Sequence, residues 1–376
     1  MKICFLADAK ATHIKRWSEY FANKGHEVHL LTLNPDVLLN YTNVILHLIR
    51  KKPKRAPTLI SRLTNLLPFV IRIKRLINEI KPDILHAHSV GGYGWLGILT
   101  GFHPLLITPW GNDILIDIEK SKIERFLTKI ALQRADLVHC DGENIREVLV
   151  KLGVAPEKIE YICFGVDTIK FSPQLRDEAL RNSLFSPDVK IVISTRFLTQ
   201  VHDVRTLIKA IPSVKNEVPE ARFIIIGDGP ESEYLIGLCK SLDIIDIVKF
   251  TGRISENDLP AYMASADIYV STSLSESGLA ASTAEAMACG LAIINTDTGD
   301  IGKWIKNGEG GFIIPVRDPA ALAQRVICLL RNEEMRKKCG EINRRVIEER
   351  NNYFKEMAKM EEIYSRLTGV KIYGDK

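Results

Sequence analysis

The sequence predicts an α/β protein with two doubly wound domains, each built on a parallel sheet with helices on its faces. Short β-branched segments alternate with longer amphipathic ones, which is the pattern of βαβ units. This series starts at Lys2 and a second, similar series starts near Val189. A chain of 376 residues also exceeds what one hydrophobic core usually organises. Two domains of similar size are therefore expected.

The first series gives the N-terminal domain. An amphipathic helix from about His13 to Lys24 is expected to stop at Gly25, where a left-handed residue can close it. The β-branched segments predict strands at 2–7, 27–33, 83–88, 104–108, 135–140 and 159–163. Helices are expected between them.

The second series predicts strands at 190–194, 222–226, 247–250, 268–271 and 292–295. Between the two series lies a polar, proline-containing stretch, 171–187, where the chain is expected to cross. The predicted domains are 1–170 and 171–351, with a C-terminal helix of about 352–376 returning to the first domain. Open α/β sheets bind ligands at the carboxyl ends of their strands, so the search for a site starts there.

Composition limits the partners and the compartment. The formal charge of +5 is modest for this length, and no nucleic-acid partner is expected. The seven cysteines are scattered singly, with no C-x-x-C pair, which fits a reducing cytoplasm. No apolar run approaches the roughly 20 residues of a membrane span, so at most the inner face of a membrane is expected as a second location.

A glycine turn in the second domain is a candidate anion site. The motif Gly227-Asp228-Gly229-Pro230-Glu231 follows an apolar strand and precedes a helix. Glycines let the backbone approach a ligand, and the helix offers free N–H groups to an anion. Gly229 and Pro230 are therefore candidate binding residues. A plain strand-to-helix turn would explain the same motif.

Gly278 is expected to open a helix that runs through small side chains to Cys289-Gly290. The unpaired amides of Leu279 and Ala280, at the positive end of this helix, would suit a diphosphate. A small-residue helix packed tightly on the sheet is the alternative.

Three charged side chains are expected near these turns. Glu285 would lie about two turns inside the helix, where a buried carboxylate needs partners such as the two hydroxyls of a ribose. Arg196 directly follows a strand, and a guanidinium there can hold phosphate oxygens. Glu276 comes just before the second turn. A surface salt bridge for Arg196 and a solvated loop position for Glu276 remain open.

These residues carry a resemblance. Arg196, the glycine turn and the stretch 275–290 are similar to glycosyltransferase family 4, and 13–28 and 164–167 extend the likeness over nearly the whole chain. The resemblance implies the GT-B fold, with two facing Rossmann-like domains, and retaining transfer of a sugar from a nucleotide diphosphate such as UDP to a hydroxyl. It also implies that Glu285 binds ribose, that Glu276 contacts the donor sugar, and that Arg196 contacts the phosphates in catalysis.

Two departures from the family pattern affect these roles. Glu276 and Glu285 are one residue further apart than the family's usual acidic pair, so the loop must bulge or Ser277 must occupy the usual site. A lysine often follows the phosphate arginine, but the nearest match here is His202. A histidine is only partly cationic near pH 7, so donor binding is expected to depend more on Arg196 and to vary with pH.

The first domain is expected to hold the acceptor. Lys10 and His13 follow its first strand and are candidates for contact with the acceptor or the diphosphate, although ordinary helix capping would also explain them. Trp110 stands where the family often has a histidine and would stack on a sugar face. Asp113 is the nearest carboxylate in that loop.

His86 and His88 end a strand and, by alternation, point to the same face. A metal site would need a third ligand that the sequence does not provide. We favour acceptor positioning in catalysis for His88, with a hydrogen-bonded structural histidine as the alternative. No Asp-x-Asp sequence occurs, so neither a metal nor another cofactor is expected beyond the sugar nucleotide itself.

A basic cluster at 50–55 precedes an amphipathic stretch at 59–80. The segment 50–80 could contact an anionic membrane and bring the site to a lipid-linked acceptor, although a solvated basic face is the simpler explanation. The expected acceptor is a glycan or lipid-linked saccharide of cell-envelope or polysaccharide biosynthesis.

Three other functions compete with transfer. A nucleotide-sugar 2-epimerase on the same fold would need no acceptor. A non-catalytic partner subunit would keep the nucleotide pocket, and the unusual Trp110 and His202 favour that alternative. A dinucleotide oxidoreductase is disfavoured because the glycine turn lacks the third glycine of G-x-G-x-x-G.

Overall fold

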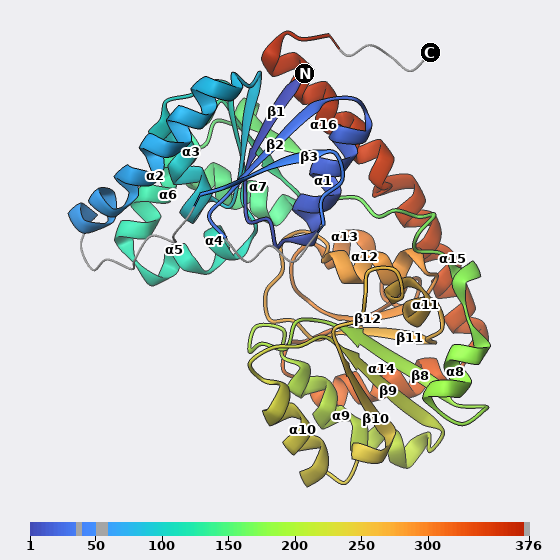
Figure 1. The fold of residues 1–376 in the computed structure, drawn as a ribbon. Coiled ribbons are helices and arrows are strands. Elements are labelled where there is room, and N and C mark those ends of the chain that lie inside the picture. Colours follow the sequence, from blue (N-terminus) through green and yellow to red (C-terminus); the bar gives the residue numbers. More distant parts are fainter. Residues whose placement is uncertain (35–39, 50–58, 372–376) are drawn as a thin grey trace. The chain divides into compact units, whose positions relative to one another are not determined.

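The structure is a computed structural model that describes residues 1–34, 40–49 and 59–371. The chain divides into two compact units (Figure 1). Unit 1 comprises Met1–Phe164 and the chain from Lys355 onward, and unit 2 comprises Gly165–Phe354. The domain limits expected from the sequence, near 170 and 352, lie close to these boundaries.

Unit 1 contains a parallel sheet of seven strands in the order β3-β2-β1-β4-β5-β6-β7. The strands are β1 (Lys2–Leu6), β2 (Glu27–Thr32), β3 (Val44–Leu48), β4 (Ile84–His88), β5 (Leu105–Thr108), β6 (Leu137–Cys140) and β7 (Ile159–Tyr161). The sequence prediction missed β3. This strand lies at the edge of the sheet, and two of its apolar side chains, Ile45 and Leu48, are exposed. Its pairing with β2, rather than its own pattern, makes it a strand.

The helices of unit 1 flank this sheet. They are α1 (Thr12–Asn23), α2 (Leu59–Ile80), α3 (Trp95–Thr100), α4 (Asn112–Leu115), α5 (Asp117–Lys120), α6 (Lys122–Arg134), α7 (Glu143–Lys151) and α16 (Tyr353–Thr368), of which α16 begins just before the unit boundary. Gly25 follows α1 with φ of +87°, as expected for the residue that closes that helix. Apolar side chains of α2, α3, α6 and α7 share one core with the strands.

A chain of buried hydrogen bonds ties α16 to the sheet. The carbonyl of Ile162 can only accept, so His139 donates to it through Nε2, at 2.8 Å. Burial lowers the pKa of His139 to about 4, so its Nδ1 is free to accept from Thr108 at 3.0 Å. Thr108 in turn accepts from His86 Nε2 at 2.7 Å, and His86 Nδ1 accepts from the hydroxyl of Tyr364 at 2.5 Å. The hydrogen bonds therefore fix the tautomer of both histidines.

Unit 2 contains a parallel sheet of six strands in the order β10-β9-β8-β11-β12-β13. The strands are β8 (Lys190–Thr195), β9 (Ala221–Ile226), β10 (Val248–Gly252), β11 (Ile268–Ser271), β12 (Ala292–Thr296) and β13 (Gly311–Ile314). The sequence prediction missed β13, because it begins with a glycine after a glycine-rich loop. A Cβ at Gly311 would lie 1.9 Å from the carbonyl oxygen of Ile293, so only glycine fits beside β12.

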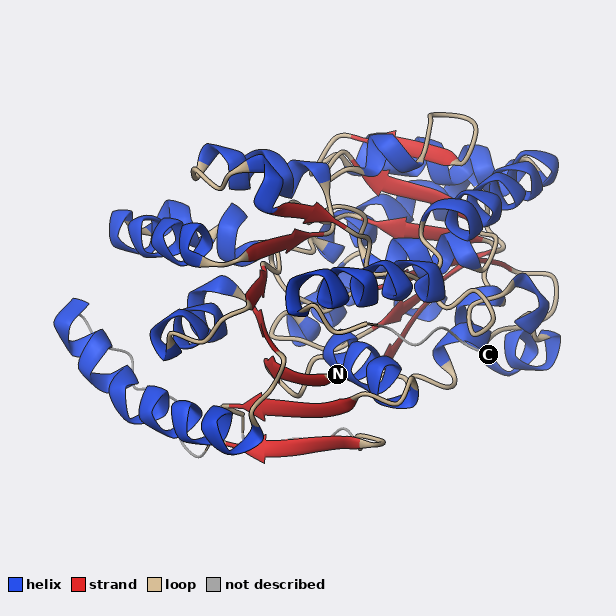
Figure 2. Ribbon diagram, turned by 90° about the horizontal axis from the view of Figure 1, so that it is seen from above, coloured by secondary structure: helices blue, strands red, loops and turns tan. Residues whose placement is uncertain are grey.

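Helices flank the strands of this sheet as well (Figure 2). They are α8 (Glu178–Leu184), α9 (Val204–Glu217), α10 (Ser232–Ser241), α11 (Leu259–Ala264), α12 (Ala281–Ala288), α13 (Ile301–Trp304), α14 (Pro319–Arg331) and α15 (Glu333–Arg350). Apolar side chains of α9, α10 and α14 form the larger core with the strands, while α12 packs against α15. Within the described ranges, no helix combines the length and apolar character that a membrane crossing requires.

Candidate functional site

The candidate site of unit 2 lies at the carboxyl edge of its sheet. Arg196 follows β8, Gly227 follows β9, and the loop that holds Glu276 follows β11. These three strands are neighbours in the order β9-β8-β11, and all are parallel. The three loops therefore leave the same edge of the sheet, where open α/β sheets bind ligands.

The glycine turn packs against the backbone that carries Arg196. A Cβ at Gly227 would lie 2.1 Å from the carbonyl oxygen of Arg196, and a Cβ at Gly229 would lie 2.3 Å from that of Leu198. Both glycines have positive φ, of +136° and +156°. The amide of Leu198 donates to the carbonyl of Asp228 at 2.8 Å. The turn thus holds the loop after β8 in place, and ligand contact by Gly229 and Pro230 stays a prediction.

The Arg196 side chain is buried, with 9% of its surface exposed. It forms an ion pair with Glu276 and donates through a terminal nitrogen to Ser282 Oγ at 2.8 Å. Its Nε is buried and has no hydrogen-bond partner among the described residues. A buried donor without an acceptor is costly, so this nitrogen is suited to an incoming anion.

Glu276 is also buried, with 13% of its side chain exposed, and it points to Arg196 rather than to solvent. The neighbouring Ser277 is half-buried. The carboxylate therefore neutralises the guanidinium. Its predicted contact with the donor sugar would require this ion pair to open.

Helix α12 begins later than the sequence analysis expects. Gly278 lies in a bend before the helix, with φ of +50°, and its carbonyl accepts from the amide of Asp300 at 2.9 Å. Ala280 is the N-cap, and the first helical hydrogen bond runs from Ala284 to Ala280 at 3.0 Å. The four amides at the start of the helix that have no partner within it are therefore those of 280–283, so Ala280 is among them and Leu279 lies before them.

Glu285 lies one turn after the start of α12, not two, as a consequence of this later start. It is buried, with 6% of its surface exposed, as expected of a carboxylate on the inner side of the helix. Its predicted contact with a ribose stays a prediction.

His202 lies in the same loop after β8 as Arg196, and its Nδ1 is 2.9 Å from the hydroxyl of Thr199. Burial, and then the charge of Arg196, lower the pKa of His202 below its usual 6.5. The ring is therefore mostly neutral at pH 7, and it supplies less positive charge than the sequence analysis expects.

In unit 1, His88 lies in a cluster of rings. Its ring centroid is 4.1 Å from that of His86, 5.4 Å from that of Trp17 and 5.8 Å from that of Phe5. His88 is fully buried, and neither ring nitrogen has a partner among the described residues. Burial lowers its pKa well below 6.5, so the ring is neutral. No atom of His88 is exposed for the predicted contact with an acceptor.

His13 and Trp110 lie at the half-buried rim of this cluster, with ring centroids 4.6 Å apart and edge to face. Burial, and then the charge of Arg16, lower the pKa of His13 to about 4. Asp113 accepts from the amides of Val90 and Trp110 at 2.7 and 2.9 Å, which fixes the loop after β5.

Lys10 follows β1 and is exposed. No group of three or more His, Cys, Asp or Glu side chains within 1–34, 40–49 and 59–371 is arranged to hold a metal ion.

Comparisons with known proteins identify the family of this chain. Residues 176–346 match the family of group 1 glycosyl transferases, and residues 2–142 match the glycosyl transferase 4-like family. The chain belongs to the family 4-like glycosyltransferases. It is 25% identical over 355 residues to N-acetyl-alpha-D-glucosaminyl L-malate synthase of Bacillus anthracis, covering 91% of this chain and 90% of that protein.

Solved structures show the fold of this glycosyltransferase. Sucrose-phosphate synthase from Thermosynechococcus elongatus superimposes with a TM-score of 0.84 at 19% identity, over 99% of this chain and 100% of that one. Anabaena HepE in complex with UDP gives a TM-score of 0.83 at 19% identity, over 98% and 100%. The predicted GT-B fold class and the prediction of a transferase enzyme are confirmed.

Two residues of the candidate site in unit 2 were missed in the sequence analysis. Ser282 was treated only as one of the small side chains of α12, yet it accepts a hydrogen bond from Arg196. Tyr269 is fully buried in β11, and its hydroxyl donates to Ser282 Oγ at 2.8 Å. The available signal was a hydroxyl in the first helical turn and a lone tyrosine in an aliphatic strand.

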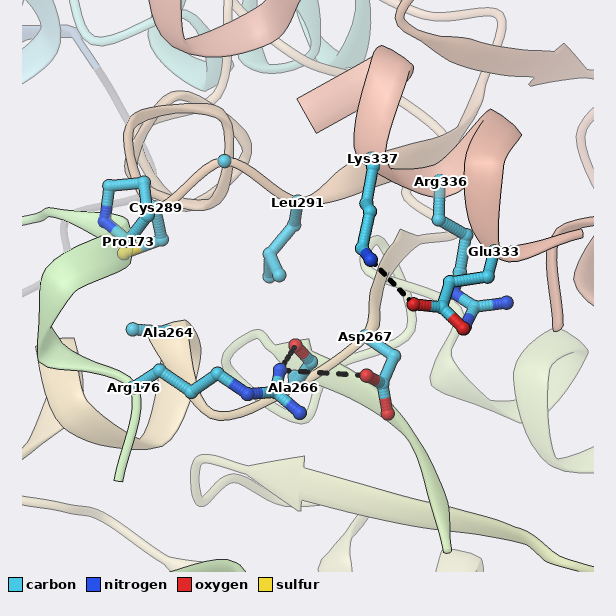
Figure 3. A pocket seen from close by; sticks show the side chains of 11 residues that line it. Pro173, Arg176, Ala264, Ala266, Asp267, Cys289, Leu291, Glu333, Arg336 and Lys337 are labelled. Atoms are coloured by element: carbon cyan, nitrogen blue, oxygen red, sulfur yellow. Dashed lines mark hydrogen bonds and ion pairs between the residues drawn. The ribbon is translucent and has the colours of Figure 1, made fainter. Parts of the chain in front are cut away.

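The glycosyltransferase also has a pocket of about 370 Å³ at the other edge of the same sheet. It is lined by Pro173, Arg176, Ala264, Ala266, Asp267, Cys289, Gly290, Leu291, Glu333, Arg336 and Lys337. Figure 3 shows its charged side chains pairing with one another, Lys337 with Glu333 at 2.6 Å and Arg176 with Asp267 at 3.6 Å. Asp267 and Leu291 precede β11 and β12, so this pocket lies at the amino edge, opposite Arg196.

Proposed function

We propose that the enzyme is a retaining glycosyltransferase that moves a sugar from a nucleoside diphosphate to a hydroxyl of a glycan or lipid-linked saccharide. The observation that supports this most is Arg196, a buried cation whose Nε lacks an acceptor, beside the start of α12. A helix start and a guanidinium together suit a diphosphate. The buried Glu285 further along α12 would hold the ribose.

In the proposed reaction, the bond between the anomeric carbon and the diphosphate breaks, and its electron pair stays on the phosphate oxygen. Arg196 and the amides of 280–283 stabilise that charge. The acceptor oxygen bonds to the anomeric carbon on the face that the diphosphate leaves, and the acceptor's proton passes to the departing phosphate. These protein groups would provide the charge stabilisation, and we propose that no divalent ion is required.

Thermal-shift measurements with UDP-, GDP- and ADP-sugars test the donor class. A nucleotide sugar at a hundred times its Kd should add about 2.7 kcal/mol to the free energy of unfolding and so raise Tm. Turnover of the stabilising donor is then measured with a mixture of glycan and lipid-linked acceptors, with and without a chelator. A chain that none of the three donor classes stabilises would contradict the proposal.

The rival functions predict different products in the same assay. An epimerase would convert the donor with no acceptor present, and a non-catalytic subunit would bind the donor with neither hydrolysis nor transfer. Loss of activity with a chelator, restored by magnesium, would contradict the metal-free mechanism.

For the acceptor, we propose the half-buried rim of unit 1, where His13 and Trp110 offer ring faces and Lys10 is exposed nearby. Aromatic faces suit the apolar face of a sugar ring. His88 is buried next to His13, with ring centroids 6.4 Å apart, and would affect acceptor binding only by supporting the position of the His13 ring.

We also propose that the segment 50–80 contacts an anionic membrane. Residues 50–58 lie outside the described residues, and the support comes from the described part of α2. Leu67 and Ile71, one helical turn apart, are 57% and 54% exposed, and Lys74 and Arg75 follow them on the exposed side. Exposed apolar side chains beside basic ones are typical of interfacial helices.

Sedimentation with vesicles tests this contact. Binding to vesicles of phosphatidylglycerol and phosphatidylcholine should weaken about tenfold when Leu67 and Ile71 are both replaced by Gln, because their burial in lipid is lost. Ile245→Gln in unit 2, where the side chain is 40% exposed, is the matched control and should bind as the wild type does. Equal binding of all three proteins would contradict the proposal.

A further inference from the structure

Ser282 occupies an unusual position beside Arg196. It is the second residue of α12, and its Oγ accepts two hydrogen bonds, from Arg196 at 2.8 Å and from the Tyr269 hydroxyl at 2.8 Å. A serine hydroxyl has two acceptor lone pairs and one hydrogen. Both lone pairs are used, so the hydrogen of Ser282 must point away from Arg196 and from Tyr269.

Both donors to Ser282 are held in place. Tyr269 lies in the middle of β11 and is fully buried, so its hydroxyl has little freedom. Arg196 is fixed by Glu276 on its other side. Ser282 itself is half-buried, so part of this residue remains accessible from solvent.

We propose that Ser282 donates a hydrogen bond to the departing diphosphate, and that Tyr269 is a positioning residue that orients Ser282. The inference rests on the proposed function and adds two residues to its donor site. A hydroxyl that is oriented before the reaction stabilises the charge developing on a phosphate oxygen without reorganisation. In the same way, Ser282 keeps the guanidinium of Arg196 in place when the diphosphate displaces Glu276.

The test compares nucleotide binding and turnover in Ser282→Ala, Ser282→Thr and Tyr269→Phe. Isothermal titration with UDP, GDP and ADP identifies a diphosphate that the wild type binds, and the matching monophosphate, which lacks the departing phosphate, serves as reference. Ser282→Ala should weaken diphosphate binding about ten- to a hundredfold, as expected for a lost hydrogen bond to a charged group, and leave monophosphate binding within about twofold.

Ser282→Thr keeps the hydroxyl and should bind the diphosphate nearly as the wild type does. Tyr269→Phe should weaken diphosphate binding by a smaller factor, about three- to tenfold. The Ser282 hydroxyl remains in this variant, but it loses the hydrogen bond that fixes its orientation. Ser183→Ala is the matched control, since Ser183 is exposed on α8 and bonds only a helix carbonyl. Ser282→Ala and Tyr269→Phe each remove a hydroxyl and add no volume, so we expect both variants to fold. The Tm of each variant without nucleotide checks this.

The outcomes separate this inference from the proposed function. A wild type that binds none of the three diphosphates overturns both. Diphosphate binding unchanged in Ser282→Ala, but weakened in a variant of Arg196, overturns the inference alone. Equal weakening of diphosphate and monophosphate binding in Ser282→Ala would also overturn it, because the hydroxyl would then not act on the departing phosphate.

Discussion

Arg196→Ala should lower kcat about a hundred- to a thousandfold, the loss usual when one preorganised donor to a developing oxyanion is removed. Arg196 is the buried cation at the carboxyl ends of β8, β9 and β11, and its Nε lacks a protein acceptor. In the proposed reaction, negative charge develops on the departing diphosphate, and this nitrogen would donate to it. The measurement is steady-state turnover with the donor and acceptor identified by the assays above.

Two further variants make the result specific to Arg196. The alanine variant also takes the ion pair away from Glu276, so Glu276→Gln measures that loss separately. Arg222→Ala is the matched control, because Arg222 is half-buried and donates to backbone carbonyls near β9. It should turn over as the wild type does. Unchanged turnover in Arg196→Ala would remove this residue from the mechanism.

The repeated pattern of strands and helices made the fold readable from the sequence. Buried strands such as β9 and β11 are mostly apolar segments, and their positions were predicted within one residue. The edge strands β7 and β10 were predicted, whereas β13, which begins with Gly311, and the partly exposed β3 were missed. An edge strand has a neighbour on one side only, so part of its surface stays polar or exposed, as Ile45 and Leu48 show. Whether such a segment forms a strand depends on its pairing with a neighbouring strand, which cannot be read from the local sequence.

Only part of the candidate site could be predicted from the sequence. Its residue types and positions on loops follow from sequence, because parallel strands place their carboxyl ends together. The side-chain contacts within the site cannot be predicted from the sequence. Arg196 and Glu276 are 80 residues apart, and only the fold brings them into an ion pair. Helix α12 starts at Ala281 rather than at Gly278, whose carbonyl accepts a hydrogen bond from the amide of Asp300, a residue distant in sequence.

The protonation states of His202 and His88 could not be predicted from the sequence either. The sequence analysis treated His202 as partly cationic and His88 as available to an acceptor. Burial lowers the pKa of both, because a charged imidazole loses its hydration inside the protein. The positive charge of the candidate site in unit 2 therefore rests on Arg196, which is paired with Glu276. Binding of a diphosphate must compete with this carboxylate, so the pair would favour ligands with more than one negative charge.

Gly227→Ala should damage both stability and activity. A Cβ at this position would lie 2.1 Å from the carbonyl oxygen of Arg196, far inside van der Waals contact, and φ is +136°. The loop after β8 would have to move. We expect the free energy of unfolding to fall by about 2–5 kcal/mol, from backbone strain and overpacking together. Chemical denaturation measures this loss.

The same substitution should lower kcat at least tenfold in the protein that remains folded, because the displaced backbone carries Arg196 and a misplacement of about 1 Å already weakens catalysis strongly. Gly237→Ala is the matched control. Gly237 lies in α10, and a Cβ there would meet no atom within 4 Å, so alanine should raise stability by about 1 kcal/mol through its helix propensity. Wild-type stability and turnover in Gly227→Ala would show that the glycine turn does not hold Arg196, and the donor site would then need another support.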